Sequence, residues 1–305
     1  MTETGTAGPI LVTGATGNVG GALVSALSAA GVRVRALVRD DAQARALADA
    51  SSAGGVDGVD GVGRVEAVTG DLNEPESLVP ALSGVRAMFL LPGYRDMPGV
   101  LDRARQAGVG HVVQLSGLSA ASGDTTNAIT AYMMRSEQAV TDSGLSHTIV
   151  RPSAFMSNAL RWLDQLRTGD TVRTAFPDVA NAVLDPTDLA AVAAAALLAP
   201  DQYAGQVLLP TGPAALRPAD QVAILGTALG RPLRFEGLSD EQARKQMESD
   251  GTPEAYIAAF FDFYADGSLD ESPVRDTVER ITGRAPRTFA DWAAANADAF
   301  AFGKV

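Results

Sequence analysis

The sequence predicts an α/β protein in which a doubly wound parallel sheet is followed by a smaller, mostly helical C-terminal lobe. The first observation is a short apolar run at residues 10–13, followed by three glycines at three-residue spacing and then by one apolar helical face. The second is the alternation of strand-like and helix-like segments in the first half, which is typical of parallel sheets with right-handed crossovers. The third is the mainly helical pattern after Leu233.

The remaining elements are expected in chain order. Apolar, β-prone runs predict strands over residues 32–38, 65–69, 86–91, 111–116, 146–150 and 206–209. Helical spacing predicts helices over residues 41–50, from 75, and over 100–107, 127–143, from 185, 218–229, 240–247, 253–264, 274–281 and 289–300. Thr187 or Asp188 is expected to cap the helix from 185. The glycine-rich residues 51–63 are interpreted as a flexible loop.

Two domains are expected from this order of elements. Residues 1–152 hold the regular strand–helix alternation, and residues 153–305 hold the second lobe. Segments around 183–209 are predicted to return to the first domain.

The acidic composition excludes several classes of function. The chain has 305 residues, and its 24 Lys and Arg against 36 Asp and Glu give a net charge of −12, without any basic run, so a nucleic-acid surface is not expected. The absence of Cys excludes disulfides, thiolate nucleophiles and cysteine metal sites, and it fits a reducing cytoplasm. Residues 1–9 do not resemble a signal peptide, and residues 189–199 are too short to span a bilayer. We expect a soluble cytoplasmic protein without a metal, nucleic-acid or membrane partner.

The strand, glycine turn and helix at residues 10–27 predict a pyrophosphate site. Backbone N–H groups and the positive end of a helix dipole meet at such a turn. Gly14 can form the tight turn, Gly17 leaves room for phosphates, and Gly20 lets the helix pack close to the sheet. The other expected contacts of the turn are Thr16, Asn18 and Val19. The alternative is a tight strand-to-helix connection that binds no ligand.

Arg39 ends the second expected strand, where side chains of this fold meet the adenosine ribose. A guanidinium can bind a 2′-phosphate as a fork, so Arg39 favours NADP(H) over NAD(H), unless it is only a solvated surface residue beside Asp40. Asp71 ends the third strand and is expected either to contact the adenine or to cap the next helix, as Asn73 also can.

The fourth and fifth strands end at the same carboxyl edge of the sheet, where open α/β sheets bind ligands. The fourth is broken by Pro92 and Gly93, and the fifth ends at Ser116. His111 and His147 begin their strands at the opposite edge, so a histidine general base is not expected.

Several motifs resemble the NmrA-like group of atypical short-chain dehydrogenases, which have a Rossmann fold. They are residues 12–20, 34–39, 70–72, 143–152, 185–189 and 283–289. The resemblance implies NADP(H) held by the glycine turn, Arg39, Asp71 and Leu72. It also implies a nicotinamide close to Leu91, Pro92, Gly93, Ser116 and the segment from Pro152 to Phe155.

The chain departs from the Tyr-x-x-x-Lys pair of standard short-chain dehydrogenases. The corresponding helix has Tyr132-Met-Met-Arg-Ser136, and the only two lysines are Lys245 and Lys304. The sequence therefore predicts an NADP(H)-dependent reductase of quinones, enones or ketones, in which Tyr132, Ser116 or water supplies the hydrogen bond or proton. Members of the group also act as redox sensors, and a non-redox step such as cyclisation or dehydration is the third hypothesis.

A small aromatic or conjugated substrate is expected to lie against Tyr94, Phe155 and Met156. For Phe155 and Met156 the alternative is ordinary core packing. The oligomeric state is left open.

Overall fold

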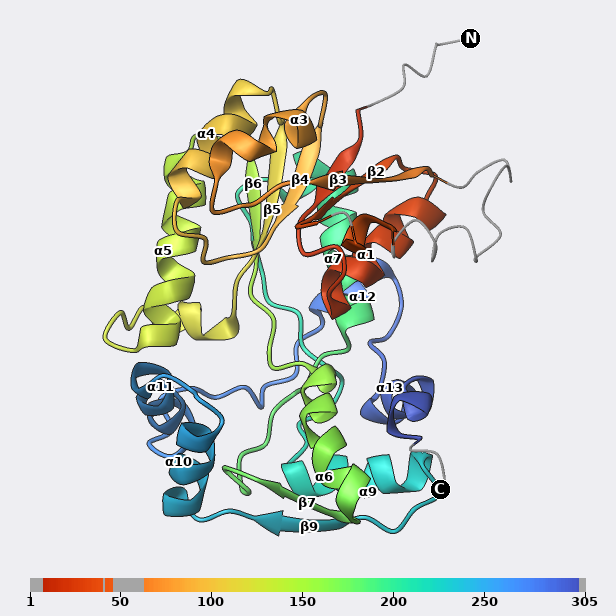
Figure 1. The fold of residues 1–305 in the computed structure, drawn as a ribbon, viewed down its shortest axis with the longest axis vertical. Helices are drawn as coiled ribbons and strands as arrows, with labels where there is room; N and C mark the ends of the chain where they lie inside the picture. Colours follow the sequence, from red (N-terminus) through yellow and green to blue (C-terminus); the bar gives the residue numbers. More distant parts are fainter. Residues whose placement is uncertain (1–7, 41, 46–62, 302–305) are drawn as a thin grey trace. The chain divides into compact units, whose positions relative to one another are not determined.

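The computed structural model describes residues 8–40, 42–45 and 63–301, and these fall into two compact units. Unit 1 comprises residues 1–117, 132–151 and 189–208, and unit 2 comprises residues 118–131, 152–188 and 209–305, each within the described ranges. The segments 189–208 and 118–131 thus belong to a different unit from their neighbours in sequence. The ribbon is shown in Figure 1.

Unit 1 is built on a seven-stranded parallel sheet of order β3-β2-β1-β4-β5-β6-β8. The strands are β1 (Ile10–Val12), β2 (Val34–Val38), β3 (Val65–Thr69), β4 (Ala87–Leu90), β5 (His111–Leu115), β6 (His147–Val150) and β8 (Val207–Leu208). The chain runs outward from β1 to β3 and then continues on the other side of β1 with β4. The carboxyl ends of β1 and β4 therefore lie at the switch point where such sheets bind ligands.

Helices cover both faces of this sheet, as the doubly wound pattern predicts (Figure 1). One face carries α3 (Val79–Leu82), α4 (Met97–Gln106) and α5 (Ala128–Asp142), with a 3-10 turn, η1 (Pro75–Leu78), before α3. The other carries α1 (Asn18–Ala29) and α7 (Pro186–Leu198), and α8 (Pro200–Tyr203) precedes β8. The β1, β4 and β5 side chains are almost fully buried, because parallel strands are covered on both sides.

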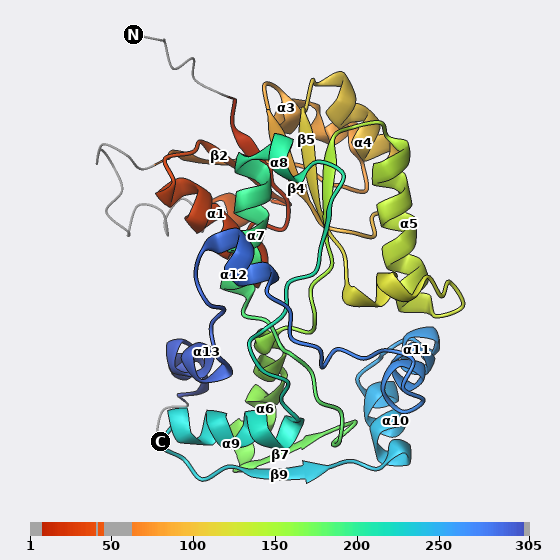
Figure 2. The ribbon, with the colours of Figure 1, turned by 180° about the vertical axis from the view of Figure 1, so that it is seen from behind.

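Unit 2 has its own apolar core around a two-stranded parallel sheet of β7 (Thr171–Thr174) and β9 (Arg234–Gly237). Helix α9 (Pro218–Ala228) packs against β9 and α13 (Phe289–Ala295), as Figure 2 shows. The other elements are η2 (Leu118–Ser122), η3 (Met156–Trp162), α6 (Leu163–Thr168), α10 (Asp240–Ser249), α11 (Glu254–Tyr264), α12 (Thr277–Thr282) and η4 (Ala297–Phe300).

The predicted fold class is confirmed, with corrections to individual elements. Strands β7 and β9 were not predicted, because each has four residues and pairs with a segment about 60 positions away. The helix expected over 289–300 breaks at Asn296 and continues as η4. The N-cap of α7 is Asp185, whose carboxylate accepts the Thr187 N–H at 2.7 Å, rather than Thr187 or Asp188.

Two predicted segments lie wholly or partly outside the described residues. Residues 42–45 of the helix expected over 41–50 are helical, and the rest of that helix is not described. The glycine-rich stretch 51–63 is described only at Gly63. Among the helices that the structure describes, none combines the length and apolar character that a membrane crossing needs.

Candidate functional site

The glycine turn between β1 and α1 has the geometry expected of a phosphate loop. Gly14 has φ of +62°, which L side chains rarely adopt, and a Cβ there would lie 2.5 Å from the Leu91 side chain. A Cβ at Gly20 would overlap the carbonyl oxygen of Gly14. Gly17 is exposed, and a Cβ there would make only ordinary contact, 3.4 Å from the Gly14 oxygen. Gly14 and Gly20 are thus required by the fold, whereas Gly17 is compatible with a side chain in the protein alone.

The start of α1 fits a dinucleotide pyrophosphate. Its N-cap is Gly17, and no side chain caps the helix there. The first-turn amides of a helix have no intrahelical acceptor, so those of Asn18, Val19 and Gly20 can donate to an anion. Thr16 and Asn18 are exposed beside Gly17. No acidic side chain lies in the first turn of α1, so nothing there repels a phosphate.

Arg39 is exposed directly after β2, and its neighbour Asp40 caps the helical residues that follow. The Asp40 carboxylate accepts the Gln43 N–H at 2.8 Å and so caps the helical residues 42–45. The side-chain oxygen of Gln43 in turn accepts the Arg39 N–H at 3.1 Å. These contacts fix the backbone of Arg39 and leave its guanidinium outside the cap.

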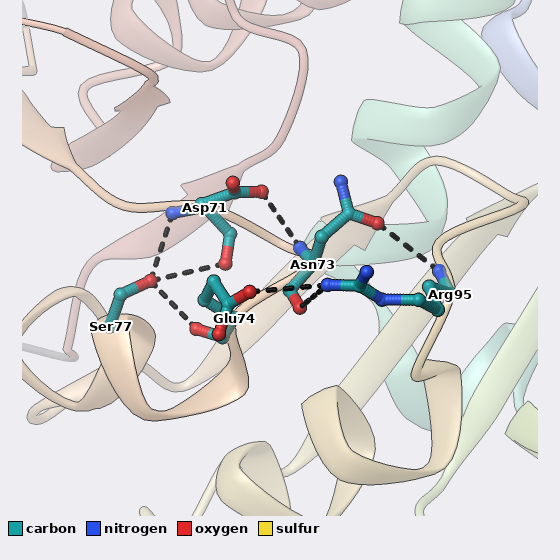
Figure 3. A network of polar contacts seen from close by, with 5 residues as sticks. All are labelled: Asp71, Asn73, Glu74, Ser77 and Arg95. Carbon is teal, nitrogen blue, oxygen red and sulfur yellow. Dashed lines mark hydrogen bonds and ion pairs between the residues drawn. The ribbon is translucent and has the colours of Figure 1, made fainter.

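Asp71 belongs to a polar network after β3 (Figure 3). Its carboxylate accepts the Asn73 N–H at 2.8 Å, and its own N–H donates to the Ser77 hydroxyl at 2.9 Å. Arg95, which follows β4, donates to the Asn73 carbonyl and pairs with Glu74 at 3.1 Å. The network joins the loops after β3 and β4. Asp71 shapes its own loop and remains exposed at the carboxyl edge. The expected helix cap is not formed, because the N-cap of η1 is Glu74 and no side chain caps it.

Leu72 points away from that edge. Its side chain is almost fully buried in the apolar cluster beneath α3 and α4, so only its backbone is available to a ligand.

Hydrogen bonds hold the turn after β4 on two sides. The Leu91 N–H donates to the buried Thr13 hydroxyl at 3.0 Å, next to the glycine turn. On the other side the Tyr132 hydroxyl donates to the Pro92 carbonyl at 2.9 Å, and the Gly93 N–H donates to the Ser136 hydroxyl at 3.0 Å. The predicted residues Leu91, Pro92, Gly93 and Tyr132 are therefore brought together in unit 1.

Ser116 lies in a buried ion-pair cluster at the ends of β5 and β6. Its hydroxyl donates to Glu137 at 2.5 Å, and Arg151 binds the same carboxylate as a fork at 2.8 and 2.5 Å. Ser116 and Glu137 are 4 % and 7 % exposed. Because the Ser116 proton is directed at a carboxylate, its oxygen offers lone pairs rather than a proton to other groups.

Tyr94 is half-buried beside the predicted cofactor residues. Burial raises the pKa of its phenol above the usual value, and the neighbouring Tyr132 and Asp71 raise that pKa further while Arg39 lowers it. The phenol therefore stays protonated over the neutral range. Its electrostatic neighbours lie at the ends of β2 and β3, as well as on α5.

Three predicted site residues belong to unit 2. Pro152 is buried, and its carbonyl accepts the Leu118 N–H at 3.0 Å. Phe155 is half-buried and forms a parallel bridge with Leu184. Met156 is 1 % exposed within the apolar cluster of this unit, which corresponds to the core-packing alternative.

His111 has a structural environment, as its place at the start of β5 indicated. Its two ring nitrogens lie 2.9 Å from the Ser146 hydroxyl and 3.1 Å from the Thr148 hydroxyl. Burial, and secondarily His147, lower its pKa, so the buried ring is neutral at physiological pH.

The family model of the NmrA-like family matches residues 6–293. The chain belongs to the NmrA-like family. It is 38 % identical over 296 residues to the (4-alkanoyl-5-oxo-2,5-dihydrofuran-3-yl)methyl phosphate reductase of Streptomyces griseus, covering 96 % of this chain and 99 % of that protein. It is 37 % identical over 297 residues to the NAD(P)H azoreductase of Xenophilus azovorans, covering 95 % of this chain and 99 % of that protein.

A solved structure has a similar fold. The NADPH-dependent quinone oxidoreductase of Escherichia coli, in complex with NADPH, superimposes with a TM-score of 0.74 at 22 % identity, over 94 % of this chain and 99 % of that one. The expected family and the expected doubly wound fold are thereby confirmed.

Sequence reasoning missed three residues that organise unit 1. Ser136, Glu137 and Arg151 were placed on elements without a role, yet they hold the β4 turn and Ser116. A signal existed for Ser136, which lies four positions after Tyr132 where standard short-chain dehydrogenases have lysine. No spacing pattern links Glu137 to Ser116 and Arg151, because helix α5 meets the strand ends only in the folded chain.

Proposed function

We propose that this chain is an NADPH-dependent reductase that transfers hydride to a conjugated small molecule, such as a quinone or an enone, without a Tyr–Lys pair. The relatives confirm the expected oxidoreductase class and the NADP(H) cofactor. The observation that carries the proposal is the uncapped start of α1 at an open Gly17, with Arg39 exposed at the end of the adjacent strand. Together they provide amides for a pyrophosphate and a guanidinium for a 2′-phosphate.

The proposed class of hydride acceptor follows from the hydrogen bonds that the candidate proton donors make. NADPH supplies the hydride when it is bound. The Tyr132 proton is held by the Pro92 carbonyl and the Ser116 proton by Glu137, so neither hydroxyl is poised as a strong proton donor. A quinone or enone delocalises the charge that hydride brings, and therefore does not need one. We propose that Ser116 orients a bound group through its lone pairs and that water provides the proton.

The remaining proposals concern the substrate class, an apolar contact of the substrate and the cellular compartment. Azo compounds belong with quinones and enones in the proposed substrate class, because one relative is named an azoreductase. Phe155 is proposed as an apolar contact of the substrate, and the cytoplasm as the compartment.

A binding and turnover experiment tests this function. The purified protein is titrated calorimetrically with NADPH, NADP⁺ and NADH, and NADPH oxidation is then followed at 340 nm with quinones, enones and azo compounds. We expect tighter binding of NADPH than of NADH, and NADPH consumption only when an acceptor is present. Binding without oxidation across the panel would contradict the reductase and support a redox sensor or a non-redox enzyme.

A further inference from the structure

Two side chains of α5, one helical turn apart, hold the turn that follows β4. Tyr132 donates its hydroxyl proton to the Pro92 carbonyl at 2.9 Å. Ser136 donates to the Tyr132 carbonyl at 3.1 Å, and its oxygen accepts the Gly93 N–H at 3.0 Å. Ser136 is 2 % exposed, so this arrangement satisfies a hydroxyl and an amide away from water.

The Tyr132 ring also fixes the shape of the same turn. Gly93 has φ of +88°, and a Cβ at this position would overlap the Tyr132 hydroxyl and ring carbons. Glycine is therefore required at this position both by its backbone conformation and by the ring that lies against it. Tyr132 thus contacts the turn through its ring carbons as well as through its hydroxyl.

The turn at residues 91–93 also contacts the glycine loop, which is the turn between β1 and α1. Leu91 precedes Pro92, and its side chain lies so close to Gly14 that a Cβ there would be 2.5 Å from it. The Leu91 N–H donates to Thr13 at 3.0 Å. A continuous series of contacts therefore runs from α5 through residues 91–93 to the glycine loop, and every member lies in unit 1.

We propose that Tyr132 and Ser136 are positioning residues that hold residues 91–93 against the glycine loop and so set the affinity for NADPH. The inference rests on the proposed function for its cofactor, and it assigns to Tyr132 a role other than proton donor. Ser136 occupies the position of the standard lysine but is neutral, so it provides no cation beside the phenol. The Tyr-x-x-x-Ser pair acts on the backbone of the turn instead.

Two conservative variants test this role. Tyr132→Phe removes the bond to Pro92 and keeps the ring against Gly93, whereas Ser136→Ala removes the acceptor of the Gly93 N–H. One hydrogen bond contributes about 0.5–1.5 kcal/mol, so each variant is expected to weaken NADPH binding by about twofold to tenfold. We also expect kcat at saturating NADPH to change by less than about twofold and the pH–rate profile to be unchanged. Amide exchange of residues 91 and 93–95 should be faster in both variants.

Two control variants test whether the effect is specific to Tyr132 and Ser136. Thr141→Ala removes a hydroxyl that bonds to the carbonyl four residues earlier on the same helix, and Tyr256→Phe removes an exposed phenol on α11. Both are expected to bind NADPH like the unaltered protein. A large loss of kcat in Tyr132→Phe with unchanged NADPH affinity would overturn the proposal and make Tyr132 the proton donor. Unchanged affinity and exchange in both variants would overturn it as well.

The failure of the reductase proposal would be distinguishable from the failure of this one. If the unaltered protein binds NADPH but reduces no acceptor, the calorimetric and exchange comparisons still decide whether Tyr132 and Ser136 hold the turn.

Discussion

We expect the choice between NADPH and NADH to depend on the side chain of Arg39. Its neighbour Asp40 caps a helix, so among the described residues directly after β2 the Arg39 guanidinium is the charged group outside that cap. A charge-assisted hydrogen bond contributes about 1.5–3 kcal/mol. We expect Arg39→Ala to weaken NADPH by about tenfold to a hundredfold in calorimetric titration and to leave NADH nearly unchanged. Arg105→Ala, which removes an exposed charge on α4, is the control. Equal losses for both cofactors would mean that Arg39 does not bind the 2′-phosphate.

Glu271 is a buried carboxyl in unit 2 whose protonation affects stability. It is 6 % exposed and accepts the Tyr264 hydroxyl at 2.9 Å and the Ala154 N–H at 3.0 Å. Burial raises its pKa above the ordinary 4.5, although the two hydrogen bonds oppose the shift. Between about pH 4.5 and the folded pKa, Glu271 is protonated in the folded state and ionised in the unfolded state. The free energy of unfolding therefore falls as pH rises through this range.

Glu271→Gln removes this titration and keeps a side-chain oxygen that accepts hydrogen bonds. In thermal unfolding between pH 4.5 and 7.5, we expect the variant to gain stability relative to the unaltered protein as pH rises. Glu241→Gln, an exposed glutamate paired with Lys245, is the control and is expected to show no such trend. A pH-independent difference between Glu271→Gln and the unaltered protein would contradict the prediction.

At the scale of elements, the β1–α1 connection separates Gly14 and Gly20, which the fold needs, from Gly17, which we propose that a bound phosphate needs. A Cβ at Gly20 meets the Gly14 carbonyl, whereas a Cβ at Gly17 meets nothing closer than 3.4 Å. We expect Gly20→Ala to lower the melting temperature of the protein without cofactor. Gly17→Val is expected to leave that temperature nearly unchanged and to abolish NADPH binding in titration. NADPH binding by Gly17→Val with unaltered affinity would remove the assignment of the phosphate loop.

At the scale of the whole molecule, the sheet order explains why the sequence could predict that the candidate site residues of unit 1 lie at one edge of the sheet. Strands β1, β2, β4 and β5 are parallel neighbours, so their carboxyl ends meet at one edge. Residues 14–20, 39, 91–93 and 116 each follow one of these strands directly. To predict their common location, it was therefore enough to recognise the strands in the sequence. The second unit was less predictable, because β7 and β9 are short and join distant segments of the chain.

The sequence by itself determined the alternation of strands and helices, the glycine turn and the residues at the strand ends, since each depends on local periodicity and on glycine or proline conformation. Only the tertiary structure decided what the hydroxyls do. Tyr132 and Ser116 were both predicted from sequence as hydrogen-bonding groups, but the Pro92 carbonyl and the Glu137 carboxylate determine where their protons point. A hydroxyl can donate in several directions, and its direction depends on acceptors that approach from other elements when the chain folds.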